Sequence, residues 1–352
     1  MSRLPPLPEK SGAYRWFYAD VTAGDLTAVF IFMVGSVFSP RYSASLRKGG
    51  LPAHHCAVNF ALYERGVRWL WVLSEYGEAE VTANGLRIGA SSLEFGPGGR
   101  LRAHLADKTP LWGRPAEATL ELTPRGPRGP EVALVEGQPH WWQPLAPRAS
   151  ARVTVPQHQL DFTGSGYHDS NHGDEPLGRA FAGWRWTRLH QPSQTLVDYL
   201  PTGGAPPLRV RATDSEVTLE RGEPGVRPSL RLRSDGQAVS IEHRAPARST
   251  STGPEGTGLL APRPSPPAPP SLLVRTGWGL SVPKALEAGG TVLSTRPSLL
   301  ETSPFYARLE ARDKESHALA EVADFRRFHS PCVRWMARLR TRTGALTRGS
   351  PP

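Results

Sequence analysis

The sequence predicts an all-β protein, on three observations. Glycine (35) and proline (36) make up about a fifth of the 352 residues, which favours many turns over long helices. The apolar segments are short, and several alternate apolar with polar side chains. Turn-forming residues separate these segments at close intervals, a spacing typical of a β-barrel or β-sandwich.

The first half of the chain predicts two hairpins followed by shorter strands. Residues 14–42 form the first hairpin, in which a turn at residues 22–25 precedes a strand from Leu26 to Phe38. The second joins residues 56–63 to residues 67–74 across the turn Glu64-Arg65-Gly66. Further strands are expected at residues 85–88, 92–95, 101–106, 118–123, 151–155 and 160–163.

A second set of strands predicts a second domain. These strands are expected at residues 182–190, 195–200, 208–212, 217–221, 230–233, 239–244, 272–280 and 305–311. Residues 245–271, rich in Pro, Ser, Thr and Gly, have too little apolar content to pack and predict a flexible loop. We therefore divide the chain into domains at residues 1–176 and 177–315, with a distinct tail at residues 316–352.

The tail differs in kind from the rest of the chain. Between Ser316 and Arg342 there is no glycine, and apolar residues recur at helical spacing, which predicts one or two helices broken at Pro331. The final segment carries several arginines around Trp335. That composition suits a helix lying on anionic lipid, and equally a helix that closes one end of a barrel with arginines on its wet face.

The net charge indicates which kind of surface the protein could bind. The formal net charge is +10, which suits an anionic surface, although a high arginine content can also reflect genome composition. No zinc-finger spacing, recognition helix or RNA-binding aromatic signature is present, so a membrane surface is favoured over nucleic acid.

Cysteine usage and hydropathy argue against several other classes. Cys56 and Cys332 are far apart and in no metal-binding spacing, so neither a disulfide framework nor a structural zinc site is expected. The most apolar run, residues 28–38, is too short to span a bilayer and predicts a buried strand. The first residues lack a continuous apolar stretch, so no signal peptide is expected. A cytoplasmic, non-integral protein is the resulting expectation.

The densest group of titratable and aromatic residues lies between His140 and Trp186. It comprises His140-Trp141-Trp142, the run from Gly164 to Gly173 (GSGYHDSNHG), and Gly183-Trp184-Arg185-Trp186. Strand alternation sends Tyr167 and Asp169 to one face and His168 to the other, and likewise pairs His140 with Trp142. Taken alone, an aspartate in a glycine-rich stretch is more often a turn former, and these aromatics are more often core residues.

The chain resembles the carotenoid 1,2-hydratases, also called hydroxyneurosporene synthases. Six stretches carry the resemblance, and they occur in the same order as in the family. They are Trp16-Phe17-Tyr18, VGSVFSP at residues 34–40, HCAVN at 55–59, LRIG at 86–89, Gly-x-Gly-Tyr-x-Asp-x-Asn at 164–171, and SPFYAR at 303–308. Ser170 stands where the family more often has histidine, which affects hydrogen bonding around the motif, whereas Asn171 is kept.

The resemblance implies a fold, a site and a set of partners. The fold is two tandem lipocalin-like β-barrels, with the site in the first. The site residues fall on His140, Trp142, Tyr167 and Asp169, with Asp169 as proton donor, and we add Trp184, Trp186 and Asn171 as substrate contacts. No metal or organic cofactor is implied. The implied partners are an acyclic carotenoid, the inner membrane as a peripheral surface, and other enzymes of the carotenoid pathway.

Hydration of an unactivated alkene needs such residues. A proton must reach the less substituted carbon, and positive charge then develops on the tertiary carbon before water adds. An aspartic acid in an apolar pocket stays protonated because desolvation raises its pKa, and aromatic faces stabilise the cation. His140 is expected to hold the water or to reprotonate Asp169.

A different class of function also fits part of this pattern. Two lipocalin-like barrels could carry a carotenoid or another lipid without reacting with it. His168 and His172 have a spacing that suits metal binding on a helix, but this segment is expected to be a strand. No nucleophile elbow and no phosphate-binding loop occurs in the sequence.

Overall fold

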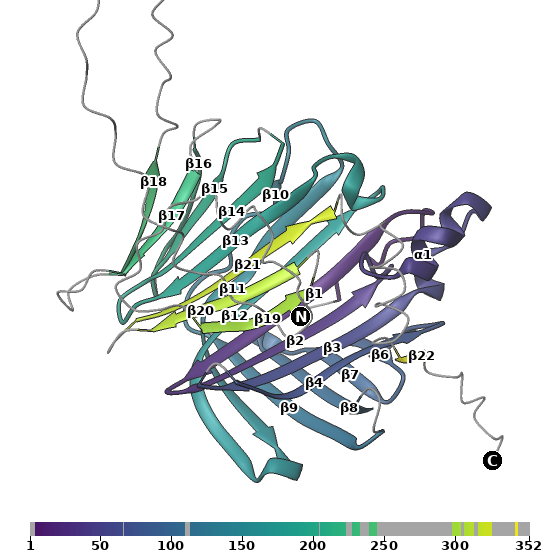
Figure 1. The fold of residues 1–352 in the computed structure, drawn as a ribbon, viewed down its shortest axis with the longest axis horizontal. Coiled ribbons are helices and arrows are strands. Elements are labelled where there is room, and N and C mark those ends of the chain that lie inside the picture. The colour runs from purple at the N-terminus through teal and green to yellow at the C-terminus, as the bar shows by residue number, and fades with distance from the viewer. Residues whose placement is uncertain are drawn as a thin grey trace, which may run out of the picture.

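The computed structural model describes residues 4–65, 67–109, 113–203, 205–222, 227–232, 239–244, 298–303, 306–312, 316–325 and 342–343. They form two large sheets that lie against each other, with a small two-stranded sheet at one side (Figure 1). Every strand pair among these residues is antiparallel except β22 with β4. The prediction of an all-β protein is confirmed. The predicted strand at residues 272–280 and the predicted loop at residues 245–271 lie outside the described residues.

The first sheet holds thirteen strands in the order β22-β4-β3-β2-β1-β12-β11-β9-β8-β7-β6-β5, with β10 paired to β11. Their bounds are β1 Tyr14–Ala23, β2 Leu26–Val34, β3 Cys56–Glu64, β4 Val67–Tyr76, β5 Glu80–Val81, β6 Gly85–Ile88, β7 Ser91–Phe95, β8 Leu101–Lys108, β9 Pro115–Pro124, β10 Val132–Ala133, β11 His140–Val155, β12 Leu160–Gly173 and β22 Arg342–Thr343. Short helices connect them: α1 Pro40–Ser45, η1 Leu46–Lys48, η2 Pro52–His54, η3 Pro97–Gly99, η4 Pro156–His158 and, after β12, η5 Leu177–Arg179.

The first sheet curls around its own core. Phe17, Phe30 and Phe60 from the early strands are buried together with Leu93 and Leu120 from strands on the far side of the sheet. Strand β3 also contacts β6, and β4 contacts β8, although neither pair is adjacent in the sheet. Every second side chain of β1, β2 and β3 faces this core, and most of the side chains between them are buried on the opposite face, so both faces of these strands are covered.

One predicted strand ends earlier than expected. The strand that begins at Leu26 stops at Val34 rather than at Phe38. Gly35 has a φ of +71°, and a Cβ there would lie 2.5 Å from the Ala13 carbonyl oxygen. Only glycine fits this left-handed, close-packed corner, which turns the chain out of the sheet.

The second sheet has seven described strands in the order β16-β15-β14-β13-β21-β20-β19. Their bounds are β13 Gly183–His190, β14 Thr195–Thr202, β15 Leu208–Ala212, β16 Val217–Arg221, β19 Ser298–Ser303, β20 Tyr306–Arg312 and β21 His317–Asp324; β17 Arg227–Leu232 and β18 Val239–Arg244 form the separate pair. In the sequence the described strands of this sheet begin after residue 176, where we placed the domain boundary.

The prediction of a helix from Ser316 was wrong for residues 317–324, which form β21. This strand lies between β13 and β20 and is buried along most of its length, on both faces. A strand covered on both sides does not need to alternate, so Leu319, Val322 and Ala323 mimicked a helical spacing. Residues 326–341, the rest of the predicted helical tail, lie outside the described residues.

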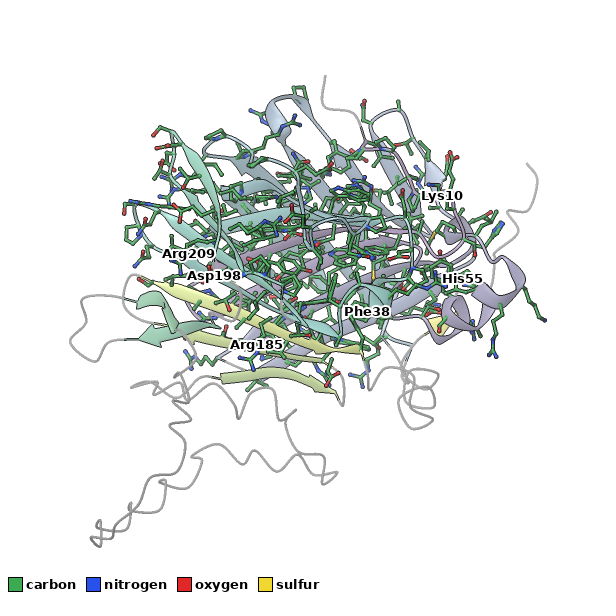
Figure 2. The ribbon with its side chains drawn as sticks, turned by 90° about the horizontal axis from the view of Figure 1, so that it is seen from above. Lys10, Phe38, His55, Arg185, Asp198 and Arg209 are labelled. Carbon is green, nitrogen blue, oxygen red and sulfur yellow. The ribbon has the colours of Figure 1, made fainter. Side chains whose placement is uncertain are left out.

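The convex face of the first sheet packs against the second sheet through an aromatic layer. Trp16, Tyr18 and Trp142 come from the first sheet, and Trp184 and Trp186 from the second. Seen from above, side chains fill the space between the two sheets, and Asp198 and Arg209 pair on neighbouring strands of the second (Figure 2). This layer, rather than the inside of the first sheet, holds the candidate site.

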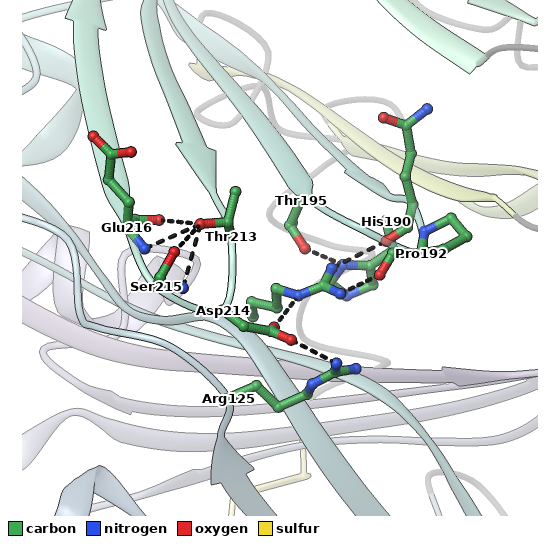
Figure 3. Close-up of polar contacts among 10 residues, drawn as sticks. Arg125, His190, Pro192, Thr195, Thr213, Asp214, Ser215 and Glu216 are labelled. Atoms are coloured by element: carbon green, nitrogen blue, oxygen red, sulfur yellow. Dashed lines mark hydrogen bonds and ion pairs between the residues drawn. The ribbon is translucent and has the colours of Figure 1, made fainter.

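Polar contacts tie the two sheets together at one end of this layer. The guanidinium of Arg148 on β11 donates to the carboxylate of Asp214 and to the carbonyl oxygens of Gln191 and Pro192, all from the second half of the chain. Arg125 donates to the same carboxylate at 2.7 Å (Figure 3). The two halves are therefore joined by specific bonds as well as by apolar packing.

Candidate functional site

Strand β12 presents Tyr167, Asp169 and Asn171 on the face that meets the second sheet. In the neighbouring strand β11, Trp142 lies opposite Asn171, and Pro144 lies opposite Asp169. His168 points the other way: its Nδ1 contacts the Tyr18 carbonyl oxygen, and its ring packs against Phe95. The predicted alternation is confirmed, and Asp169 lies within a strand rather than a turn.

The two oxygens of the Asp169 carboxyl group have different surroundings. Oδ2 accepts two hydrogen bonds, one from Trp142 Nε1 at 2.9 Å and one from the Tyr167 hydroxyl at 2.7 Å. Oδ1 has a single longer contact, with Asn171 Nδ2 at 3.4 Å. Because Oδ2 already accepts from two donors, a proton on this carboxyl group is best placed on Oδ1.

Burial makes Asp169 a carboxylic acid that can be neutral near neutral pH. The residue is only 3% exposed, and desolvation raises its pKa to about 7. The hydrogen bonds from Trp142 and Tyr167 act in the opposite direction, and the nearby carboxylates of Glu321 and Asp20 add to the rise. Asp169 is thus suited to give up a proton and take it back.

Aromatic rings from both sheets surround this acid. The ring of Trp186 packs against Tyr167 at 5.4 Å and against Tyr18 at 5.4 Å between centroids. The ring of Tyr199 packs against Trp142, also at 5.4 Å. A positive charge that forms beside the acid would therefore face π-systems, which stabilise a cation by about 0.5–2 kcal/mol each.

Trp184 lies further along the same layer. Its ring contacts Trp16 at 5.9 Å, Tyr199 at 6.5 Å and Phe325 at 5.1 Å. Trp184 and Trp186 are therefore both part of the layer between the sheets, but only Trp186 contacts a ring that is bonded directly to Asp169.

His140 is buried, and the structure does not bring it to Asp169. Its Nδ1 lies 2.9 Å from the Tyr14 hydroxyl, and its Nε2 lies 3.4 Å from Glu175 Oε1. His140 lies four positions along β11 from Pro144, the residue opposite Asp169, which is about 13 Å at the usual rise of a strand. Burial lowers the pKa of His140 against the opposing effect of Glu175, which favours a neutral ring.

The position opposite His140 has room only for glycine. Gly173 lies opposite it, and a Cβ at that position would be 2.6 Å from His140 Nδ1 and 2.7 Å from the Tyr14 ring. The glycine that closes the β12 motif is thus required for the contact between His140 and Tyr14.

The strand that carries Trp142 is irregular next to the acid. The pairing of β11 with β12 shifts register between Pro144 and Ala146 and again between Ala146 and Ala149. Proline has no backbone N–H to give to the ladder, and bulges are common beside active sites because they redirect side chains. No such irregularity was predicted from the sequence.

A buried charged cluster lies beside the site and was missed by sequence reasoning. Asp20 on β1 pairs with Arg188 on β13 at 2.7 Å, and both side chains are fully buried. Arg308 on β20 pairs with Glu321 at 2.9 Å and donates to the Tyr63 hydroxyl of the first sheet at 2.9 Å. The members are far apart in the sequence, so no local pattern could have linked them; Arg308 was noted only within the stretch SPFYAR.

Within the described part of the chain, no three His, Cys, Asp or Glu side chains gather closely enough to share a metal ion. No helix among those residues is long and apolar enough to cross a bilayer.

Comparisons with known proteins identify the family. The family described as "Carotenoid hydratase CrtC" matches residues 30–203, which include Asp169 and its hydrogen-bond donors. An acyclic carotenoid 1,2-hydratase of Thiocapsa roseopersicina is 30% identical over 92% of this chain and 72% of its own length. The chain belongs to the carotenoid 1,2-hydratase family.

Other family members agree with that assignment. The hydratase of Rubrivivax gelatinosus is 30% identical over 90% of this chain and 68% of its own length, and that of Rhodobacter capsulatus is 27% identical over 88% and 96%.

Among solved structures, one from Nitrosomonas europaea described as AttH has a TM-score of 0.49 and 13% identity, over 89% of this chain and 93% of that one.

Proposed function

We propose that this protein is a hydro-lyase that adds water to the terminal C1=C2 double bond of acyclic carotenes, giving 1-hydroxy carotenoids. Membership of the hydratase family supports the reaction. The observation that carries the mechanism is the buried carboxyl group of Asp169, with one oxygen held by two donors and the other facing Asn171. None of the relatives reported above is named as a carrier, so a non-catalytic role has no support from them.

In the first step, Asp169 Oδ1 gives its proton to C2 of the alkene. The π electrons form the new C2–H bond and leave the positive charge on C1, the tertiary carbon. The negative charge left on the carboxylate is stabilised by Trp142 and Tyr167, which already donate to Oδ2. These two residues therefore lower the barrier without touching the alkene.

In the second step, a lone pair of a water molecule forms the C1–O bond. The water then loses one proton, which restores the neutral Asp169, so the sum is one alkene plus one water. The rings of Trp186, Tyr18 and Tyr199 are placed to stabilise the cation between the two steps. No step in this scheme draws on a cofactor.

His140 has a positioning role in this proposal, because it is too far along β11 to exchange a proton directly with Asp169. Its contacts with Tyr14 and Glu175 fix the end of β11 that precedes Trp142. Trp184 is proposed as a wall for the carotene beyond the reacting end.

We propose that only the reacting end of the linear carotene enters this site and that the rest of it stays in the membrane. The net charge of +10 favours a peripheral position on an anionic inner-membrane surface, where other carotenoid-pathway enzymes would act on the same pool.

One assay tests both the reaction and the surface. Purified protein is mixed with lycopene or neurosporene in vesicles of neutral lipid or of lipid with anionic headgroups, with no added cofactor. We expect a product heavier by one water, formed faster in the anionic vesicles. Pigment that binds with unchanged mass would instead mean a carrier, and equal rates in the two vesicles would contradict the membrane proposal.

The rate of hydration should decrease as pH rises through about 7. Only the protonated form of Asp169 can start the reaction, and burial raises its pKa to about 7. Activity is therefore highest below that pH and falls above it, which is the reverse of the profile expected for a general base. Initial rates between pH 5.5 and 9 check this, and a rate that increases with pH would exclude Asp169 as the acid.

A further inference from the structure

Asn171 contacts Asp169 and lies on β12 between two strands that each place a tryptophan beside it. Within the first sheet its neighbours are Trp142 on β11 and Trp16 on β1. From the second sheet, Trp184 packs on Trp16, Tyr199 packs on Trp142, and these two rings lie 6.5 Å from each other. Asn171 thus lies beside the two tryptophans of the first sheet against which Trp184 and Tyr199 of the second sheet pack.

One polar atom of Asn171 and one of Tyr199 lack a hydrogen bond. Among the described residues, neither Asn171 Oδ1 nor the Tyr199 hydroxyl has a partner, and both residues are 2% exposed. Buried polar groups in native proteins are nearly always satisfied, because leaving one unpaired carries the full cost of its desolvation. Asn171 contacts Asp169, and burial together with the charge of Asp169 raises the pKa of Tyr199, so both groups lie near the acid. An unpaired acceptor and an unpaired hydroxyl near an acid point to a small polar ligand that both of them hold.

The reaction itself needs such a ligand. Water must attack C1 from a fixed position, and it becomes acidic as its oxygen bonds to the cation. Asn171 Oδ1 can accept one of its hydrogens, and the Tyr199 hydroxyl can accept another or donate to the water oxygen. Trp142 links the two halves of the arrangement, because it donates to Asp169 and its ring packs against Tyr199.

We propose that Tyr199, a residue of the second sheet, is a catalytic residue that together with Asn171 holds the attacking water beside Asp169. This inference rests on the proposed function, and it separates the two halves of the reaction: the first sheet supplies the proton, and the second sheet helps to supply the nucleophile. Tyr199 lies outside the stretches that carry the family resemblance, and no local sequence pattern marks it.

Removal of one hydroxyl group tests the proposal in deuterium oxide. The substitution Tyr199→Phe keeps the ring against Trp142 but deletes the water contact. We expect hydration to decrease about 100-fold, the scale typical of a lost positioned catalytic group. Deuteron delivery to C2 should continue, and the uncaptured cation should then lose a proton from C2 to the Asp169 carboxylate, which re-forms the alkene. The recovered alkene would then carry deuterium at C2, seen by mass spectrometry.

Three further variants serve as comparisons for Tyr199→Phe. Tyr76→Phe deletes a hydroxyl bonded to Asp107, remote from this layer, and should hydrate at the wild-type rate. Asn171→Ala should reproduce the Tyr199→Phe result, whereas Asp169→Asn should lose both hydration and deuterium incorporation. Circular dichroism confirms that each variant is folded.

Two results would overturn the role of Tyr199. One is a Tyr199→Phe variant that hydrates at the wild-type rate. The other is a folded variant that loses hydration and deuterium incorporation to the same extent, which would mean that Tyr199 acts through the acid. If the wild-type protein itself forms no hydrated product, it is the proposed function that fails.

Discussion

The substitution Asp169→Asn should abolish hydration, with a loss of about 10³-fold or more. Asparagine has nearly the same shape, and its Oδ1 can still accept from Trp142 and Tyr167, so the aromatic layer should stay intact. What it lacks is a proton to transfer, and a positioned general acid contributes typically 10²–10⁴-fold. Product formation from lycopene, measured by chromatography and mass spectrometry, checks this expectation.

A control on the same strand makes the result specific. Asp161→Asn is the same chemical change at an exposed carboxylate, bonded to Arg152 at 2.8 Å, and should leave the rate unchanged. If Asp169→Asn retained full activity, another group would have to be the proton donor.

Asp169→Asn should also change how the free energy of unfolding depends on pH. In the folded protein the pKa of Asp169 is raised from 3.8 to about 7, so between these values the folded state binds a proton that the unfolded state does not. The contribution of this group to the free energy of unfolding therefore falls as pH rises from about 4 to about 7. Asp169→Asn removes that decline, and a comparison of urea unfolding at pH 5 and pH 8 would show it.

The second large effect is expected for Arg188→Met, which should lower the free energy of unfolding by about 3–5 kcal/mol. Arg188 and Asp20 are both fully buried and join the two sheets, so removal of the cation leaves a buried carboxylate without its ion-pair partner. In the native protein, Arg188 acts against the desolvation that raises the pKa of Asp20 to about 6. The loss should be larger at pH 8, where Asp20 is ionised, than at pH 5.

Urea unfolding with an exposed pair as control measures this effect. Arg152→Met breaks the pair with Asp161 on the surface, which should change stability by less than about 1 kcal/mol. The double variant Arg188→Met/Asp20→Asn should recover part of the loss, because no buried charge remains. If Arg188→Met and Arg152→Met lowered the free energy of unfolding equally, the buried pair would contribute no more to stability than the exposed pair.

Local patterns in the sequence were enough to predict much of the first sheet and the central geometry of the site. Alternation correctly placed Tyr167 and Asp169 on one face and His168 on the other, because a strand with two different faces leaves that signal. The family resemblance then singled out Asp169 and Trp142, which the structure joins by a hydrogen bond.

What could not be predicted depends on contacts between distant parts of the chain. Because the second sheet packs on the first, Tyr199 contacts Trp142 and Arg188 pairs with Asp20. His140 was expected beside Asp169, but neighbours in a motif can be separated along an extended strand. Residues 317–324 were predicted as a helix because burial on both faces removes the alternation that identifies a strand.

The layered arrangement makes the strength of the acid a property of the whole assembly. Asp169 belongs to the first half of the chain, but part of the cover that keeps water from it, including Trp186 and Tyr199, comes from β13 and β14. If the two layers separated, the carboxyl group would be hydrated, would ionise like any surface aspartate and would no longer protonate an alkene. The match to the family description ends at residue 203, one residue beyond β14, so it includes both covering strands, and the similarity to the Thiocapsa hydratase extends over 92% of the chain.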